Sequence, residues 1–467
     1  MALDAGTIAA VATPPGEGGI GVVRISGPDA ARVAAAVFRR GKTGRPIDLA
    51  ATASHRLIYG RVVDPTTGEP IDEAVLAWMR GPRTFTGEDT VELSCHGGPV
   101  PVRETLRAVL AAGARAAEPG EFTLRAFLNG QLDLSQAEAV LGVVTARTGD
   151  GLRLALADLG GELAARIAPA RRAVFSLLAY LDAAADFPDD EIPPGDVDGD
   201  LDTALATLED VVAGSRTGML YRDGARVALV GRPNVGKSSL LNALLRSDRA
   251  IVTPIAGTTR DAIAETAEIG GMPITLVDTA GIAETTNLIE RLGIERSRQA
   301  MATATAAVLV LDGSLPPDAD DLAIARELRD RGVGGAGEFA VVAINKRDLL
   351  EHADQSAVLA MLPGCPEVHI SSVTGFGLAD LETALVRILR GDAGQSAPAL
   401  LSARQRAALD RALLHLREAD AARCAGYPID LLAVDVRAAL RALGEITGED
   451  IDEAVLAEIF SRFCIGK

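Results

Sequence analysis

One short motif constrains the fold of this chain more than any other feature. Residues 231–238 match the pattern G-x-x-x-x-G-K-[ST]; they follow an apolar run at 227–230 and precede a helical pattern at 239–245. Between a strand and a helix, such glycines let backbone N–H groups curl around a phosphate, and the helix N-terminus adds partial positive charge. Lys237 would reach the β/γ oxygens and Ser238 would ligate Mg²⁺. The motif predicts a P-loop α/β domain.

The segments after the motif extend this prediction to a sheet. Short apolar runs recur at 274–278, 306–311, 339–344 and 368–370, and they are near-continuous rather than alternating. Such runs are typical of parallel strands that are buried on both faces, with helices as the crossovers between them. We therefore predict a Ras-like domain with a mainly parallel sheet.

The rest of the chain has a different character. A length of 467 residues predicts two to four domains. Residues 1–125 mix short β-like runs with turns, which indicates an α+β domain. The sequence becomes rich in Ala, Leu and Arg from Ser135 and again from Leu401, and its apolar residues there have helical spacing. The expected fold class is multidomain α/β, with a helical domain into which the P-loop domain is inserted. The predicted division is 1–128, 129–220 (first helical part), 221–393 (P-loop domain) and 394–467 (second helical part).

Further segments follow in the order that a GTPase requires. D-T-A-G at 278–281 ends a predicted strand; its Asp can hold Mg²⁺ through water, and Gly281 can sense the γ-phosphate. N-K-x-D at 345–348 offers a carboxylate that accepts two N–H bonds from guanine, which favours GTP over ATP. Residues 371–373 resemble the loop that closes over the base, and 257–261 lie where a switch threonine would complete the Mg²⁺ shell.

The residue that orients the attacking water is left open by this pattern. Ile282 stands where Ras-like enzymes carry a glutamine. Glu284 and Glu290 are the nearest acids downstream, and spacing does not choose between them. No arginine finger is assignable, and Asn234 in the phosphate loop could ligate a monovalent cation instead.

Composition and charge restrict the partners, metal sites and location that are expected for the chain. The formal charge of −18 repels polyanions, so a nucleic-acid partner requires a local basic patch or a partner protein. The four cysteines are far apart, which argues against a zinc cluster or a disulfide framework, and no secretory signal or apolar run of membrane-spanning length is visible. These features predict a cytoplasmic protein without membrane contact. Cys464, close to the scarce lysine Lys467, is a candidate reactive thiol.

Motifs along the whole chain carry a family resemblance. The most specific are F-T-G-E-D at 85–89 and the ending F-C-I-G-K at 463–467, and others lie at 12–16, 24–27, 96–99, 119–122, 125–129 and 290–296. Together with the GTPase segments, they resemble the MnmE (TrmE) family of tRNA modification GTPases.

The resemblance implies an activity and partners. Members have an N-terminal domain that binds tetrahydrofolate and mediates homodimerisation, and a GTPase domain inserted into a helical domain. With an FAD-dependent partner, MnmG, they add an aminomethyl or carboxymethylaminomethyl group to C5 of the tRNA wobble uridine, using a one-carbon unit of a folate such as 5-formyltetrahydrofolate. GTP hydrolysis depends on K⁺-driven pairing of two GTPase domains; FAD enters only through the partner, in a heterotetramer.

The resemblance also implies roles for individual residues. Glu290 would orient water, Ser238 and Thr259 would bind Mg²⁺, and K⁺ would lie among Asn234, Thr253, Ile255 and Thr258. Arg24, Glu92 and Lys467 would contact folate, Cys464 would lie near it, and Gln131 stands where the family has a basic residue. The predicted GTP contacts are Asn234, Val235, Gly236, Lys237, Ser238, Ser239, Thr253, Pro254, Ile255, Ala256, Gly257, Thr258, Thr259, Asp278, Thr279, Ala280, Gly281, Asn345, Lys346, Arg347, Asp348, Ser371, Ser372 and Val373.

The alternative function is a regulatory RNA-binding GTPase, such as one that acts in ribosome assembly. It predicts an appended basic RNA-binding domain, which the sequence does not show, and it leaves the N-terminal domain and the C-I-G-K ending unexplained.

Overall fold

The computed structural model describes residues 6–42, 44–187, 193, 195–246, 264–278, 303–330, 340–391 and 396–466. The chain divides into two compact units: unit 1 comprises Met1–Leu141, Leu159–Ala164 and Arg441–Lys467, and unit 2 comprises Gly142–Asp158 and Ala165–Leu440. The four-part division made from the sequence stays a prediction.

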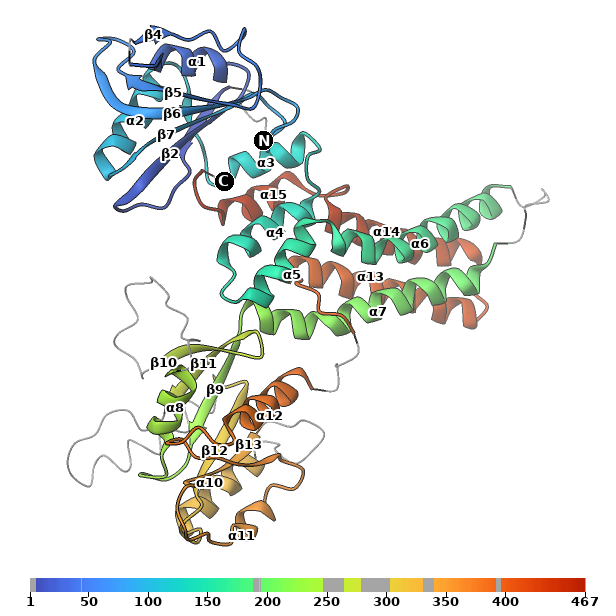
Figure 1. The fold of residues 1–467 in the computed structure, drawn as a ribbon. Coiled ribbons are helices and arrows are strands. Elements are labelled where there is room, and N and C mark those ends of the chain that lie inside the picture. The colour runs from blue at the N-terminus through green and yellow to red at the C-terminus, as the bar shows by residue number, and fades with distance from the viewer. Residues whose placement is uncertain are drawn as a thin grey trace. The chain divides into compact units, whose positions relative to one another are not determined.

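Unit 1 is built on an eight-stranded sheet with two helices on one face (Figure 1). The strand order is β4-β3-β5-β6-β7-β2-β1-β8, and the pairing is antiparallel except between β1 and β8. Buried and more exposed side chains alternate along β7, as the two-residue repeat of a strand requires: Val91, Leu93 and Cys95 face the core. The strands are β1 (Ile8–Val11), β2 (Gly18–Ser26), β3 (Phe38–Arg40), β4 (Arg45–Pro46), β5 (Arg56–Val63), β6 (Pro70–Met79), β7 (Thr90–Gly97) and β8 (Arg115–Ala116), and the helices on the sheet are α1 (Ala30–Val37) and α2 (Pro99–Ala111).

A second core in unit 1 joins helices that follow the first sheet to the helix near the C-terminus. Phe460 and Phe463 pack with Leu134 and other apolar residues of α4. Gly120 makes this possible: it has φ +68°, and a Cβ there would lie 2.5 Å from the carbonyl oxygen of Phe460. The helices involved are α3 (Glu121–Leu128), α4 (Leu134–Thr145) and α15 (Glu453–Ser461).

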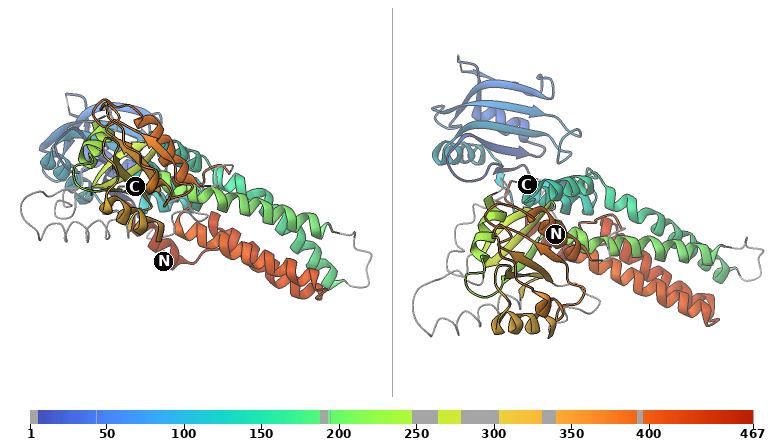
Figure 2. Two further views of the ribbon diagram at one scale, coloured as in Figure 1. Left: turned by 90° about the horizontal axis from the view of Figure 1, so that it is seen from below. Right: turned by 60° about the horizontal axis from the view of Figure 1, so that its bottom comes forward.

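Long helices form the other part of unit 2, except that the end of α5, the start of α6 and the end of α14 belong to unit 1. They are α5 (Gly149–Leu159), α6 (Glu162–Asp186), α7 (Val197–Arg222), α13 (Ala403–Cys424) and α14 (Ile429–Thr447), and Figure 2 shows α6, α7, α13 and α14 running side by side. A capping box between Ser402 and Gln405 starts α13. Gly214 and Gly218 of α7 let the backbone before α13 cross closely, since a Cβ at either would lie about 2 Å from a carbonyl oxygen.

The six-stranded sheet of unit 2 lies in the chain between α7 and α13. Its order is β10-β11-β9-β12-β13-β14, and every pairing is parallel except that of β10 with β11. Apolar clusters cover both faces. The elements are β9 (Ala225–Val230), α8 (Lys237–Arg246), β10 (Ala264–Ile269), β11 (Met272–Asp278), β12 (Ala306–Asp312), α10 (Ala319–Asp330), β13 (Ala340–Asn345), α11 (Ser356–Leu359), β14 (Glu367–His369) and α12 (Leu378–Arg390).

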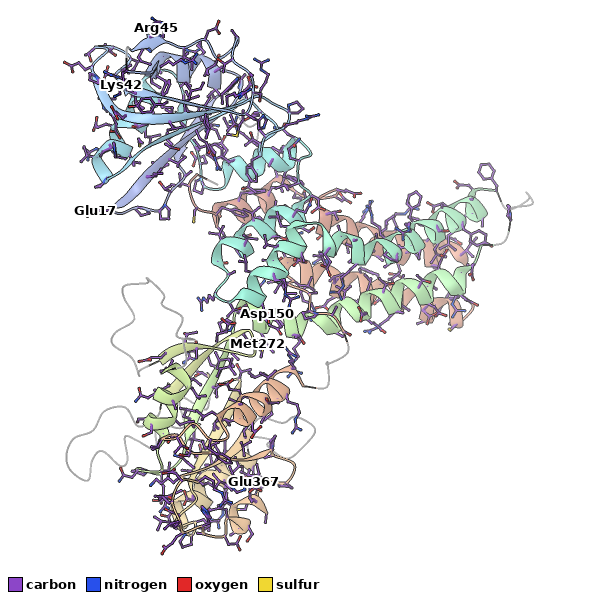
Figure 3. All side chains as sticks on the ribbon, in the orientation of Figure 1. Glu17, Lys42, Arg45, Asp150, Met272 and Glu367 are labelled. Carbon is purple, nitrogen blue, oxygen red and sulfur yellow. The ribbon has the colours of Figure 1, made fainter. Side chains whose placement is uncertain are left out.

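The predicted fold class is confirmed: a multidomain α/β chain whose second sheet is mainly parallel. The antiparallel edge strand β10 was not predicted. It turns back through Gly270 and Gly271, both at positive φ, and a Cβ at Gly271 would lie 2.1 Å from a carboxylate oxygen of Asp150 in α5. Figure 3 labels Asp150 beside Met272, the first residue of β11. Within the described ranges, no helix is both long and apolar enough to span a membrane.

Candidate nucleotide-binding site

The phosphate loop lies at the centre of the parallel sheet. It joins β9, which pairs with β11 on one side and β12 on the other, to the first turn of α8. A Cβ at Gly231 would lie 2.4 Å from the carbonyl oxygen of Val310, and a Cβ at Gly236 would lie 2.3 Å from the amide nitrogen of Asn345. Because both glycines also have positive φ, no other residue fits this loop without strain. The backbone is thus shaped to wrap an anion.

Lys237 is held inside this loop. Its side chain is buried, and Nζ donates to the carbonyl oxygens of Gly231 and Arg232, each at 2.8 Å. Ser238 and Ser239 follow in the first turn of α8 and are exposed. The ammonium group and the helix N-terminus therefore place positive charge at the same loop, which suits a polyphosphate.

Asn345 connects three of the predicted segments. Its side-chain amide donates to the carbonyl oxygen of Val235 at 2.9 Å and to Ser372 Oγ at 3.2 Å, while Oδ1 accepts from the backbone N–H of Ser372 at 3.0 Å. Asn345 is buried, with 1% of its surface exposed. We call its hydrogen bonds to Val235 and Ser372 the Asn345 brace. It sets the distance between the phosphate loop and the segments at 345–348 and 371–373.

Asp348 is oriented by the following loop. Ser371 Oγ donates to Asp348 Oδ1 at 2.6 Å, and Ser371 Oγ itself accepts from the backbone N–H of Thr374 at 3.1 Å. A carboxylate fixed in this way can accept two parallel N–H bonds from a planar base. Val373 is 80% exposed at the same loop and offers an apolar surface.

Lys346 has a different partner. Its Nζ donates to Asp312 Oδ2 at 2.6 Å, and its backbone has φ +66°. Burial raises the pKa of Asp312, but the Lys346 ammonium and the Ser314 hydroxyl and N–H outweigh it, so the pKa of Asp312 is lowered. Lys346 thus ties the N-K-x-D loop to the end of β12.

The described residues bring together the phosphate loop and both predicted guanine segments. Asp278 ends β11 and pairs in register with Leu229 of β9, one residue before the end of that strand. The predicted residues Thr253, Pro254, Ile255, Ala256, Gly257, Thr258, Thr259, Thr279, Ala280, Gly281 and Glu290 lie outside the described residues.

The sequence did not predict the ion pairs of Arg232, which anchor the phosphate loop to α10. Arg232 pairs with Asp318 at 2.6 Å and with Asp321 at 3.3 Å, both at the start of α10. Burial raises the pKa of the Asp321 carboxyl, although the N–H of Asp318 and the Arg232 guanidinium pull it down. The only sequence signal is a pair of aspartates three residues apart at a helix start.

We expect Arg232→Ala to destabilise α10 by about 2–4 kcal/mol at pH 7, because it leaves a buried carboxylate unpaired. The folded-state pKa of Asp321 is raised, so its charge costs stability above that pKa, and the cost is relieved as pH falls through it. Hydrogen exchange of α10 peptides at pH 7 and at a more acidic pH should show a loss that shrinks at the lower pH. Arg329→Ala, which breaks an exposed pair on the same helix, is the control. A loss that is the same at both pH values would contradict this reading.

A second candidate site lies on the sheet of unit 1. Arg24 of β2 pairs with Glu92 of β7, with Nε at 2.9 Å and Nη2 at 2.8 Å from Oε1. The guanidinium lies 5.7 Å from the centroid of the Phe122 ring, and Nη1 donates to the carbonyl oxygen of Gly466 at 3.3 Å. Gly466 must be glycine, since a Cβ there would lie 2.3 Å from the carbonyl oxygen of Val11. The C-terminal tail therefore lies beside this pair.

The remaining predicted residues of this site are placed differently. Cys464 is exposed on the same tail, and Lys467 lies outside the described residues. Gln131 is exposed and donates to the carbonyl oxygen of Asn129 at 3.5 Å rather than to the Arg24–Glu92 pair. Its predicted role is not tested by these contacts.

The F-T-G-E-D motif has a structural role in this unit. Glu88 accepts from the buried Arg125 of α3 at 3.0 Å and from Ser26 at 2.7 Å. Arg125 also pairs with Glu121, at 2.9 Å. Burial opposes the charge of Glu121, but hydrogen bonds from Arg115, Arg125 and the Glu118 N–H prevail and lower its pKa. This network fixes the 85–89 loop to α3.

Comparison with known proteins agrees with this architecture. Residues 134–464 match the family described as the MnmE helical domain, and residues 7–131 match the GTP-binding protein TrmE N-terminus. The chain is 50% identical to the tRNA modification GTPase MnmE of Roseiflexus castenholzii and 50% identical to that of Chloroflexus aurantiacus, in each case over 99% of both chains. It is 49% identical to that of Heliobacterium modesticaldum, again over 99% of both.

Proposed function

We propose that this chain, which belongs to the MnmE family of tRNA modification GTPases, binds and hydrolyses GTP at the 231–238 loop. The chain is a GTPase of tRNA modification. The observation that carries the proposal is the Asn345 brace, which joins a glycine-shaped anion loop to a carboxylate loop suited to guanine. Hydrolysis would drive addition of an aminomethyl or carboxymethylaminomethyl group at C5 of the wobble uridine.

The proposed roles combine the chemistry of each residue with the family resemblance, which alone selects Glu290 and Thr259. Lys237 would bind the β/γ-phosphate oxygens, Ser238 and Thr259 would ligate Mg²⁺, and Gly281 would sense the γ-phosphate. Asp348 would accept from the guanine N–H groups while residues 371–373 cover the base. Glu290 would orient the attacking water. Mg²⁺ supplies charge neutralisation at the phosphates, and the buried ammonium and loop N–H groups of this chain position them.

A monovalent cation would take the place of an arginine finger. Asn234 is exposed at the turn of the phosphate loop, where its backbone has φ +65°. With Thr253, Ile255 and Thr258 it would surround K⁺ beside the phosphates, and two GTPase domains would pair around this face. The cation would neutralise charge that develops in the transition state.

We expect GTP turnover by the purified chain to be at least about tenfold faster in K⁺ than in Na⁺ at equal ionic strength, since about 1.4 kcal/mol of transition-state stabilisation suffices. Asn234→Ala should abolish the difference between the two salts. Asn242→Ala, on the exposed side of α8, should leave it intact. Equal turnover in both salts by the unmodified chain would refute the cation proposal without touching GTP binding.

The unit 1 sheet supports a folate site and a homodimer. Leu57, Ala77, Glu92 and Arg24 lie in one row across the strands on the face opposite α1 and α2, and Leu57 is 77% exposed. An apolar side chain so exposed in the row of an arginine–carboxylate pair suits a face that binds another surface. Arg24, Glu92 and Lys467 would hold 5-formyltetrahydrofolate, with Gln131 and the Cys464 thiol nearby.

The proposed partners are those that the family resemblance implies, and the charge of the chain is compatible with them. At −18 the chain needs help to attract tRNA, and an MnmG-like FAD protein in a heterotetramer would supply basic surface and redox chemistry. The reaction would take place in the cytoplasm.

We expect Arg24→Ala to weaken binding of 5-formyltetrahydrofolate to the full chain by about 10- to 100-fold, measured by calorimetry. The substitution removes a charge-assisted donor and leaves Glu92 unpaired. Arg32→Ala breaks an exposed pair with Asp29 and should leave the affinity unchanged. Unchanged affinity in the Arg24 variant would show that folate, if it binds, binds elsewhere.

A further inference from the structure

Helices α13 and α14 carry a side-chain cluster that the GTPase and folate sites do not use. His415 and Glu418 are three residues apart on α13 and therefore share a face, and Asp435 of α14 meets them. His415 Nδ1 lies 3.1 Å from Asp435 Oδ1 and 3.3 Å from Glu418 Oε2. One ligand atom from each residue lies within 4.8 Å of the other two.

Both carboxylates of this cluster converge on one ring nitrogen, His415 Nδ1. Neither Glu418 nor Asp435 pairs with an arginine or lysine within the described part of the chain. Other carboxylates of α13 do: Asp410 pairs with Arg406, and Asp420 with Arg423.

The spacing of the three atoms suits a divalent transition metal. Ligands about 2.0–2.2 Å from a tetrahedral Zn²⁺ lie about 3.3–3.6 Å from one another. The two distances at His415 Nδ1, 3.1 Å and 3.3 Å, are near this range, and the two carboxylate oxygens lie within 4.8 Å of each other. Imidazole together with carboxylate oxygen is a common donor set for Zn²⁺, and the half-exposed position of Glu418 leaves room for water as a fourth ligand.

The surroundings would strengthen binding. His415 and Asp435 are partly buried, with side chains 32% and 27% exposed. Charge interactions are stronger at a partly buried position than in water. The ligands also come from two helices, so a bound ion would link α13 to α14.

We propose that His415, Glu418 and Asp435 form a binding site for a divalent transition-metal ion of the Zn²⁺ type, which braces the α13–α14 hairpin. The proposal is independent of the nucleotide and folate sites.

The test uses the chelator-treated full chain, with Mg²⁺ present to mask weaker oxygen sites. Zn²⁺ is titrated by calorimetry, and Co²⁺ is added separately to record its visible absorption. The unmodified chain should bind one more equivalent of Zn²⁺ than His415→Ala, and the Co²⁺ band should disappear in that variant. Asp435→Asn, which preserves shape, should weaken Zn²⁺ binding at least about tenfold.

Two control variants show whether the Zn²⁺ binds at this cluster or instead at another imidazole or an exposed thiol of the same chain. His369→Ala removes an imidazole that pairs with a single carboxylate, Glu367, at 3.0 Å, and should keep the extra equivalent. Cys464→Ser removes the exposed thiol of the C-terminal tail and should also keep it. Equal Zn²⁺ stoichiometry and Co²⁺ absorption in the unmodified chain, His415→Ala and Asp435→Asn would overturn the proposal. Loss of the equivalent in Cys464→Ser alone would assign the metal to the tail and overturn it equally.

Discussion

Replacing Lys237 by alanine should lower kcat/KM for GTP by about 10²- to 10³-fold, the cost of removing one preorganised donor to the charge of a transition state. The ammonium is buried in the phosphate loop, where two carbonyl oxygens hold it in place before nucleotide arrives. Little reorganisation would therefore be needed when phosphate binds. Steady-state turnover over a range of GTP concentrations measures the effect.

Lys42, one of the few lysines of the chain, provides a matched control for this substitution. Lys42, labelled near the edge of the unit 1 sheet in Figure 3, is exposed. Lys42→Ala should leave kcat/KM unchanged. Lys237→Arg should not restore turnover, because a planar guanidinium does not fit the point-like position between two carbonyl oxygens. Near-normal turnover in Lys237→Ala would place phosphate binding elsewhere.

Replacing Asp348 by asparagine should change the base that the site selects. The carboxylate would accept two N–H bonds from guanine, and bonds to charged groups contribute about 1.5–3 kcal/mol each. Their loss should lower kcat/KM for GTP by about 10²- to 10⁴-fold. The new amide can donate to the additional carbonyl of xanthine, so turnover of xanthosine triphosphate should rise. Competition between the two nucleotides measures the switch directly.

Two further variants locate the cause of that switch. Ser371→Ala removes the hydroxyl that orients Asp348 and should weaken GTP binding without creating a preference for xanthine. Asp354→Asn alters an exposed aspartate that accepts from the N–H and hydroxyl of Ser356, and it should change neither property. If Asp348→Asn keeps full preference for guanine, the base is read by other groups.

The parallel sheet and its loop could be predicted because their signals are local. The apolar runs for β9, β11, β12 and β13 are near-continuous, and the glycines at 231 and 236 occupy positions that tolerate no side chain. The edge strand β10 was missed because it is half exposed and pairs through a two-glycine turn, so its sequence, A-E-T-A-E-I, has no buried run.

Contacts between segments that are distant along the chain could not be predicted from the sequence. Nothing local shows that Arg232 reaches α10, that Asn345 braces the phosphate loop, or that Gly466 packs on Val11 beside Arg24. The cluster on α13 and α14 is a similar case: H-x-x-E is visible on one helix, but Asp435 joins it only through helix packing. Such pairs depend on tertiary geometry, which residue spacing within one element does not report.

The most direct test of the central claim, that GTP turnover at this loop drives tRNA modification, is nucleoside analysis of tRNA by mass spectrometry. A strain that lacks this chain is complemented with the unmodified gene, with Lys237→Ala or with Lys42→Ala. The account predicts that the C5 modification of the wobble uridine returns with the unmodified chain and Lys42→Ala, but not with Lys237→Ala. Full modification in the Lys237→Ala strain, or in the strain that lacks the chain altogether, would contradict it.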